Sequence, residues 1–307
     1  MQKLLVSLLI GFSMTAHADP PEFDKLWSFS KPADTEVKFR ELLPAAENSG
    51  SLDYKLQLLT QIARTQGLQR KFDEAHKTLD SVEKSLDKKT PVAEIRYILE
   101  RGRVFNSSKK QEQALPLFVK SYELAVERKE DNLAVDAAHM VAIAEPTADK
   151  QMEWNLKALD MAEKSKNEKA RGWLGSLYNN MGWTYHDSKK YNQALDMFKK
   201  ALAFREAKGE ASSIRTAKWT VARVHRSLDK IEEALKIQKA LEAEFDKLPE
   251  KDGYVFEELG ELYLVKKMNA ESKKYFALAY KELSKDEWMK ANEAKRLERM
   301  KEFGGGS

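Results

Sequence analysis

The chain contains no cysteine, and its 307 residues include only 13 glycines and 8 prolines. Without cysteine there can be no disulfide, no thiol catalysis and no thiolate metal site, so the folded chain must be stable through packing alone. Segments of alternating valine, isoleucine and threonine, which would indicate half-buried strands, are also missing from the sequence. These absences predict an all-helical protein.

An excess of charge of one sign is lacking too, because 53 basic and 49 acidic residues give a formal net charge of only +4. A nucleic-acid-binding protein usually has a larger basic excess or a concentrated basic face. Neither is present, so we do not expect nucleic acid as a partner. The hydrophobic content of 42% and the charged content of 33% are typical of a globular chain rather than a disordered one.

The most apolar run of the chain stands at its start. Lys3 provides a positive charge, residues 4–14 are apolar, and the small residues Ala16 and Ala18 follow. This order predicts a secretory signal peptide over residues 1–18 that is cleaved after Ala18. The run is too short to span a bilayer, and no later segment is apolar enough to do so. We therefore expect a periplasmic or secreted protein with no stable membrane insertion after cleavage.

Residues 175–208 carry a pattern of small and aromatic residues that suits two crossing helices. Gly182 and Ala194 are small enough for the two backbones to approach closely, and aromatic side chains fill the space on either side. The residues at diagnostic spacing are Tyr178, Met181, Gly182, Tyr185, Ala194, Phe198 and Ala201. This stretch resembles the tetratricopeptide repeat (TPR), a helix–turn–helix unit that buries its apolar face by stacking with further copies.

Alanines at the equivalent place in the second helix mark further copies of the repeat: Ala75, Ala114, Ala194 and Ala234, with Ser272 in the last. Their usual interval is about 40 residues, longer than the roughly 34 of a strict repeat. The long period is similar to that of kinesin-light-chain-like arrays. Together with the predicted signal peptide, it makes the chain resemble a bacterial exported TPR protein.

The resemblance implies an all-α fold, a right-handed α-solenoid of about six hairpins in one continuous domain over residues 19–303. The expected hairpins cover residues 56–88, 95–128, 132–166, 175–208, 215–244 and 253–281. Lone amphipathic helices at 32–48 and 286–303 would cap the two ends. The glycine-rich residues 304–307 would form a flexible tail or a linker.

A candidate binding groove follows from the same resemblance, which places the first helix of each hairpin on the concave side. Residues at i, i+4 and i+7 that are not used for packing would face this groove. The candidate groove residues are Arg103, Asn106, Asn179, Asn180, Trp183, His186, Trp219, Arg223, Arg226, Glu257 and Glu261. The predicted groove is basic and amide-rich in the early and middle copies and acidic in the last.

The centre of this groove has the chemistry of a peptide site. Asn180 can donate to a carbonyl and accept from an N–H of an extended peptide. Arg223 and Arg226 can bind a carboxylate with two parallel hydrogen bonds, while Trp183 and Trp219 provide apolar faces. If Arg226 serves only the groove, its replacement by alanine should hardly change the melting temperature.

Two structural interpretations of the same residues remain open. The two tryptophans can pack against each other across adjacent repeats, because aromatic residues usually bury most of their surface. Arg223 can instead pair with Glu257 or Glu261 on a solvated face, where such a pair contributes little to stability.

No catalytic or metal site is recognisable. The histidines after the predicted cleavage site fall in different repeats, without the spacing of a metal motif: His76, His139, His186 and His225. No nucleophile elbow or phosphate-binding glycine loop is present either. We therefore expect a non-enzymatic scaffold without cofactor or metal that binds a protein or an extended peptide in its groove. The sequence names neither the partner nor the oligomeric state.

Two other hypotheses stay open. The chain can bind a small anionic ligand, such as a cell-wall fragment, through Arg103, Arg223, Arg226 and the two tryptophans. A hydrolytic or metal-dependent enzyme would need a site of unfamiliar design.

Overall fold

The computed structural model describes residues 21–306, and all regular structure in this range is helical, as predicted. The predicted signal peptide, residues 1–18, lies outside the described residues. No helix within 21–306 combines the length and apolar character needed to cross a membrane. The chain divides into two compact units, residues 1–133 (unit 1) and 134–307 (unit 2), each described by itself. The single continuous domain over 19–303 therefore stays a prediction.

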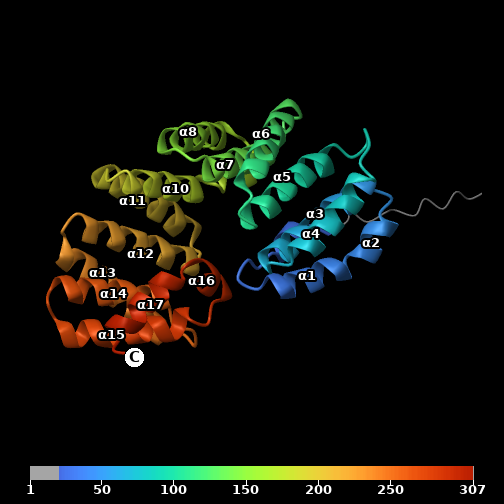
Figure 1. Ribbon diagram of the computed structural model, residues 1–307. Helices are drawn as coiled ribbons and strands as arrows, with labels where there is room; N and C mark the ends of the chain where they lie inside the picture. The colour runs from blue at the N-terminus through green and yellow to red at the C-terminus, as the bar shows by residue number, and fades with distance from the viewer. Residues whose placement is uncertain (1–20, 307) are drawn as a thin grey trace, which may run out of the picture. The chain divides into compact units, whose positions relative to one another are not determined.

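Unit 1 begins with a short 3₁₀ helix and two short α-helices, followed by two helical hairpins (Figure 1). The elements are η1 (Phe23–Leu26), α1 (Pro32–Glu41), α2 (Leu43–Asn48), α3 (Leu52–Leu68), α4 (Phe72–Glu83), α5 (Pro91–Ser107) and α6 (Gln111–Glu127). The pairs α3–α4 and α5–α6 are the first two predicted repeats, and α3 also packs against α5 and α1. Helix α7 (Asp131–Ala144) starts in unit 1 and continues into unit 2.

Unit 2 contains the remaining predicted repeats, drawn from green to red in Figure 1. Its elements after α7 are α8 (Ala148–Lys164), α9 (Glu168–Arg171), α10 (Leu174–Asp187), α11 (Tyr191–Lys208), α12 (Ala211–Ser227), α13 (Ile231–Asp246), α14 (Gly253–Val265), α15 (Asn269–Leu283), α16 (Glu287–Asn292) and α17 (Ala294–Phe303). The hairpins α10–α11, α12–α13 and α14–α15 follow one another, and α17 packs against α15. The short helix α9 was not expected from the sequence.

In the hairpins α5–α6, α10–α11 and α14–α15, the helix crossing is built from a glycine facing a phenylalanine. A Cβ atom added to Gly102 would lie 2.6 Å from the ring of Phe118, and one added to Gly182 would lie 2.5 Å from Phe198. Gly260 faces Phe276 in the same way. Each phenylalanine ring thus occupies the volume that a side chain on the first helix would need, which is the physical reason for the glycine.

Most hairpins also close with the same turn. In α10–α11, Lys189 has a left-handed backbone with φ of 57°, and the N–H of Lys190 donates to the carbonyl of Tyr185 at 2.8 Å. This Schellman pattern satisfies carbonyls that the end of the helix leaves without partners. The left-handed residues between paired helices are Arg70, Lys109, Lys189, Asp229 and Lys267. The degenerate repeat differs, because Pro146 lies in its connection and Thr147 caps α8.

Each predicted terminal cap helix is in fact two helices. Residues 32–48 form α1 and α2, which are separated at Leu42, because Pro44 has no N–H with which to continue the hydrogen bonding of α1. Residues 286–303 form α16 and α17. They are separated at Glu293, whose φ of −126° and ψ of 30° are not helical.

The glycines at 304–306, predicted to form a flexible tail, end α17 with an ordered turn. Gly305 has φ of 79°, and the N–H of Gly306 donates to the carbonyl of Lys301 at 3.0 Å. A Cβ atom on Gly304 would lie 2.9 Å from the backbone of Ala277 on α15. These glycines therefore stop the helix and allow its close approach to α15. Ser307 lies outside the described residues.

Candidate functional site

The candidate site is a cleft of about 730 Å³ on the first helices of the unit 2 hairpins. Helices α10, α12 and α14 contribute most of its wall, and α17 contributes one arginine. Three aromatic residues, three arginines, four acidic residues and a threonine line it: Trp183, Trp219, Tyr254, Arg223, Arg226, Arg296, Asp252, Glu257, Glu258, Glu261 and Thr216. Of the predicted groove residues, the structure brings six together here: Trp183, Trp219, Arg223, Arg226, Glu257 and Glu261.

The cleft has a register that explains which residues reach it. Gly260 faces the second helix of its hairpin, like Gly182 in α10–α11, and the fully buried Ala222 stands at the equivalent place of α12. Two positions of each first helix point away from the second helix, because successive residues turn by about 100°. One is the residue directly after the small residue, and the other lies two residues before it. Arg223 directly follows Ala222, and Glu258 stands two residues before Gly260. We call this side of the first helices the inner face.

Three of the four acidic residues of the cleft are paired with arginines, whereas Asp252 accepts from backbone N–H groups at the start of α14. Arg226 donates to both carboxylate oxygens of Glu258, at 2.6 and 3.0 Å, and Glu258 is only 3% exposed. From α17, Arg296 holds Glu257 in the same two-pronged way, at 2.7 and 2.6 Å. The wall is therefore a row of ion pairs across adjacent helices, in which the basic middle and the acidic end of the predicted groove neutralise each other.

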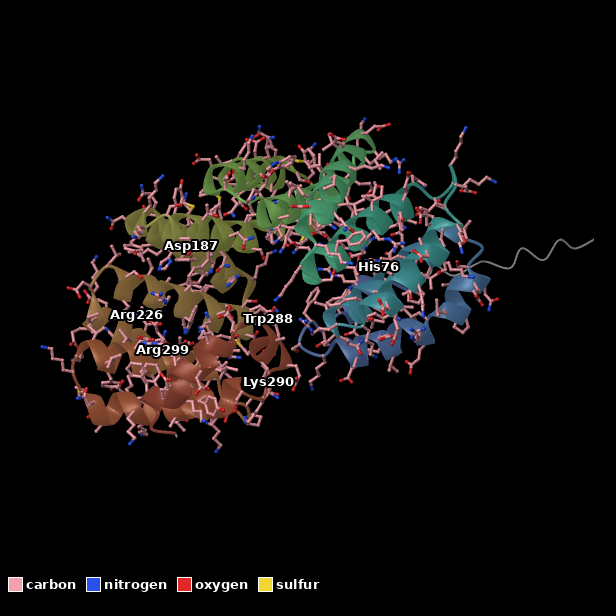
Figure 2. The ribbon with its side chains drawn as sticks, in the orientation of Figure 1. His76, Asp187, Arg226, Trp288, Lys290 and Arg299 are labelled. Atoms are coloured by element: carbon pink, nitrogen blue, oxygen red, sulfur yellow. The ribbon has the colours of Figure 1, made fainter. Side chains whose placement is uncertain are left out.

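A second ion pair joins α14 to α17, and its arginine is not among the residues that line the cleft. Arg299 of α17 donates to Glu261, which also lies 3.9 Å from Arg226 of α12. Figure 2 labels these two arginines, which come from different helices of unit 2 and meet at the same carboxylate. The C-terminal helix thus neutralises the acidic end of the predicted groove.

Arg223 is the arginine of the cleft with the most unused hydrogen-bonding capacity. It makes one side-chain hydrogen bond within the described part of the chain, from Nη1 to Ser227 Oγ at 2.9 Å. Its Nε lies 3.7 Å from Glu258, beyond hydrogen-bond distance. Burial, and then the nearby Arg226, lower the pKa of Arg223, while burial raises the pKa of Glu258 against the opposing arginines. Arg223 can therefore donate to a carbonyl or carboxylate of a ligand.

The two tryptophans contact each other and still line the cleft. Their ring centroids lie 6.2 Å apart at an angle of 40°. Trp183 also packs edge-on against Phe198, and Trp219 Nε1–H donates to the carbonyl of Tyr254 at 3.0 Å. Packing across adjacent repeats, one of the two open interpretations, is thus observed. It fixes the orientation of both rings at the cleft wall.

Three predicted residues of α10 do not line the cleft. Asn180 Nδ2 lies 3.3 Å from His139 Nδ1. His186 Nε2 lies 2.9 Å from Ser227 Oγ, and burial, followed by Arg223, lowers the pKa of His186. Asn179 has a buried side-chain oxygen with no hydrogen-bond partner in the part of the chain that the structure describes. Asn180 and His186 therefore take part in contacts between neighbouring helices within unit 2.

The two remaining predicted residues, Arg103 and Asn106, belong to α5 of unit 1. Arg103 Nη1 donates to Glu100 Oε1 at 2.6 Å, and Glu100 is only 1% exposed. Asn106 is half-buried near the end of the helix. Neither residue is part of the cleft in unit 2.

The inner face of α3 and α5 in unit 1 is covered by the chain's own residues 23–29, which we call the N-terminal segment. Trp27 Nε1–H donates to Gln61 Oε1 at 3.2 Å. Trp27 and Phe29 stack with centroids 4.7 Å apart and an angle of 7° between their planes. The guanidinium of Arg64 lies 5.4 and 5.2 Å from the centroids of these two rings.

A second arginine holds the start of the N-terminal segment. Arg96 Nη2 donates to Asp24 at 3.3 Å, and its guanidinium lies 5.4 Å from the ring centroid of Phe23. The hydroxyl of Tyr54 donates to the carbonyl of Pro21 at 2.6 Å. Unit 1 therefore shows, within one chain, how the inner face binds an irregular segment.

Sequence reasoning missed several residues that line the cleft. Tyr254 and Asp252 were not singled out because they lie at the start of α14, outside the assumed stripe. Arg296 was assigned only to a capping helix. Glu258 lies beside the predicted Glu257, and its pairing with Arg226 depends on how two hairpins stack. Its place two residues before Gly260 is the signal that could have found it.

Comparison with known proteins supports the repeat assignment. Residues 174–208 match the tetratricopeptide repeat family, which confirms the resemblance seen in the sequence. The fold is similar to a Rap protein complexed with competence and sporulation factor, with 17% identity and a TM-score of 0.63 over 86% of this chain and 74% of that one. No curated protein sequence matches this chain.

Two further solved structures have a similar fold. One is NprR in complex with its cognate peptide NprX, at 14% identity and a TM-score of 0.58, covering 89% of this chain and 82% of that one. The other is a putative kinesin light chain with nearly identical TPR-like repeats from Podospora anserina, at 14% identity and a TM-score of 0.51, covering 64% of this chain and 98% of that one. At these identities the likeness concerns the fold.

Proposed function

We propose that unit 2 is a scaffold that binds an extended segment of a partner protein or peptide in the cleft between α10, α12, α14 and α17. The observation that carries this proposal is the exposed donor capacity of Arg223 in a cleft whose other arginines and whose glutamates are paired. A peptide carbonyl can accept from Arg223, and apolar side chains can pack on Trp183, Trp219 and Tyr254. Buried aromatic contacts beside an arginine are typical of interface hot spots.

The similar folds agree with this proposal. The Rap protein was solved with competence and sporulation factor, and NprR with its cognate peptide NprX. Ligand binding by those proteins supports, by analogy of fold, a peptide or protein ligand for this chain. No catalytic step is proposed, because the glutamates of the cleft are held in ion pairs that link helices.

The alternative of a small anionic ligand has less support. It depended on Arg103, Arg223 and Arg226 acting together, but Arg103 is bound to Glu100 and Arg226 is bound to Glu258. The cleft is lined by four acidic residues against three arginines. An anion would therefore meet one available arginine in a surrounding of carboxylates.

The proposal can be tested with a displayed library of random short peptides selected on the full chain. Selected peptides should bind the wild-type protein and lose affinity for Trp219→Ala and for Arg223→Ala. A control is Lys274→Ala, because Lys274 is exposed on α15 and is not among the residues that line the cleft. If the library yields no binder, or if all binders are indifferent to both cleft substitutions, the proposed function is wrong.

We also propose that the protein is exported through cleavage after Ala18, as the sequence predicts. Mass spectrometry of the protein recovered from periplasm or medium should find Asp19 as its first residue. Recovery of only an uncleaved chain from the cytoplasm would contradict export.

A further inference from the structure

The inner faces of the two units share one arrangement of charge. In unit 1, Arg64 directly follows Ala63, whose side chain is fully buried, and its Nη1 lies 3.6 Å from Glu100. Glu100 is 1% exposed and stands two residues before Gly102 on the next first helix. An arginine on one helix thus lies over a buried glutamate on the next.

Unit 2 repeats this arrangement at the same register. Arg223 directly follows the buried Ala222, and its Nε lies 3.7 Å from Glu258, two residues before Gly260. The exposed fractions of the two arginine side chains are also similar, 21% for Arg64 and 26% for Arg223. Arg223 is therefore the counterpart of Arg64, in position and in its relation to a buried carboxylate.

The two arginines differ in what lies over them. The stacked rings of Trp27 and Phe29 lie over Arg64. Within residues 21–306, no aromatic ring lies over Arg223 in the same way, although its guanidinium faces the cleft. A guanidinium held beside a buried carboxylate has its plane presented to one side, and an aromatic face is a favourable partner for that plane.

We propose that the ligand of the unit 2 cleft is an extended peptide with two aromatic side chains in alternate positions, which stack over Arg223 as Trp27 and Phe29 stack over Arg64. This inference rests on the proposed function and names its ligand class. Side chains in alternate positions of an extended chain point to the same side, so one aromatic–x–aromatic stretch covers one guanidinium. Trp183 and Trp219 provide the flanking apolar wall.

The test uses a fluorescent synthetic peptide with the sequence of residues 21–30, added to the full chain. Because the N-terminal segment already occupies the inner face of α3 and α5, the added peptide should bind at the unit 2 cleft. Fluorescence anisotropy should show saturable binding. A peptide in which the positions of Trp27 and Phe29 are alanine should bind at least about tenfold more weakly.

Matched arginine variants locate the binding site. Arg223→Lys keeps a positive charge near Glu258 but removes the planar guanidinium, so peptide affinity should fall about tenfold while the melting temperature changes little. Arg64→Lys is the control at the equivalent position of unit 1 and should leave the affinity unchanged. A loss with Arg64→Lys but not with Arg223→Lys would overturn the proposal, because the peptide would then be exchanging with the N-terminal segment.

The outcomes for ligand class and for function can be told apart. If the peptide does not bind, or if its alanine version binds equally well, the aromatic ligand class is wrong. The proposed function would still stand if library-selected peptides without aromatic pairs depend on Trp219 and Arg223. If neither the library nor this peptide binds at the cleft, both proposals fail.

Discussion

The inner face of α3 and α5 and the cleft of α12 and α14 are built on the same register but differ in their surroundings. In unit 1 the chain covers Arg64 with its own aromatic residues, whereas in unit 2 Arg223 lies in an open cleft. The buried glutamates beneath, Glu100 and Glu258, are alike. Both inner faces are therefore built on an arginine beside a buried glutamate of the next helix. Whether such a face can bind a ligand depends on whether the chain's own residues already cover its arginine.

The largest expected effect comes from breaking the framework in unit 2. Arg226→Ala leaves Glu258 buried without its two-pronged partner, so the free energy of unfolding should fall by about 3–5 kcal/mol. This reverses the sequence-based expectation that Arg226→Ala would hardly change the melting temperature. Urea denaturation measures the change.

The matched control for that prediction removes both charges. A double variant, Arg226→Met with Glu258→Met, should recover most of the lost stability, because no buried charge is left unpaired. If Arg226→Ala leaves the free energy of unfolding unchanged, the Arg226–Glu258 pair does not stabilise unit 2. The resemblance between the buried glutamates of the two units would then have no consequence for stability.

A smaller effect is expected at the hairpin crossings, which differ from one hairpin to another. Gly182→Ala places a Cβ atom against Phe198 and should cost about 1–3 kcal/mol. In unit 1 the α3–α4 crossing instead has Ala63 and Leu79, both fully buried. Adding Phe198→Leu to Gly182→Ala reproduces that pair and should cost less than the two single effects summed. Strict additivity in the double-mutant cycle would show that the two positions are not coupled.

A stabilising change is predicted in α13. Gln238 occupies the place of Phe198 in its hairpin and is fully buried, and within residues 21–306 neither of its amide atoms has a hydrogen-bond partner. Since unpaired buried polar groups are costly, Gln238→Leu should raise the free energy of unfolding by roughly 1–2 kcal/mol. A decrease on thermal or chemical unfolding would mean that the amide has a partner in solution, such as water.

The smallest effect concerns pH. Burial lowers the pKa of His186 and His225 in unit 2, and of His76 in unit 1, from the ordinary value of 6.5. Each folded unit therefore favours the neutral ring. The resulting stability is present above pH 6.5 and is lost as the pH falls through the lowered pKa values.

Unit 2, with two such histidines, should lose more stability than unit 1 on acidification. Hydrogen exchange of the two units at neutral and at mildly acidic pH measures the difference. His186→Gln, which keeps a polar group beside Ser227, should reduce the pH dependence of unit 2. If the dependence is unchanged, His186 is not its source.

The sequence predicted those parts of the fold that depend on residues close together in the chain. Gly182 and Phe198 belong to one hairpin, and their volumes are complementary, so their spacing predicted the crossing correctly. The interruption of the first cap helix could have been expected from Pro44, whereas the one at Glu293 has no such signal. The predicted site residues were only partly brought together, because the stripe assumed identical geometry in every repeat.

By itself, the sequence determined the helical hairpins and their order, since side-chain volume and helical periodicity act over short stretches of chain. Only the tertiary structure decided which charged side chains remain available to a ligand. Glu258 meets Arg226 only when α14 packs beside α12, and Trp27 reaches Arg64 only when the N-terminal segment folds back over α3. Availability depends on contacts between residues distant in the chain, which no local pattern encodes.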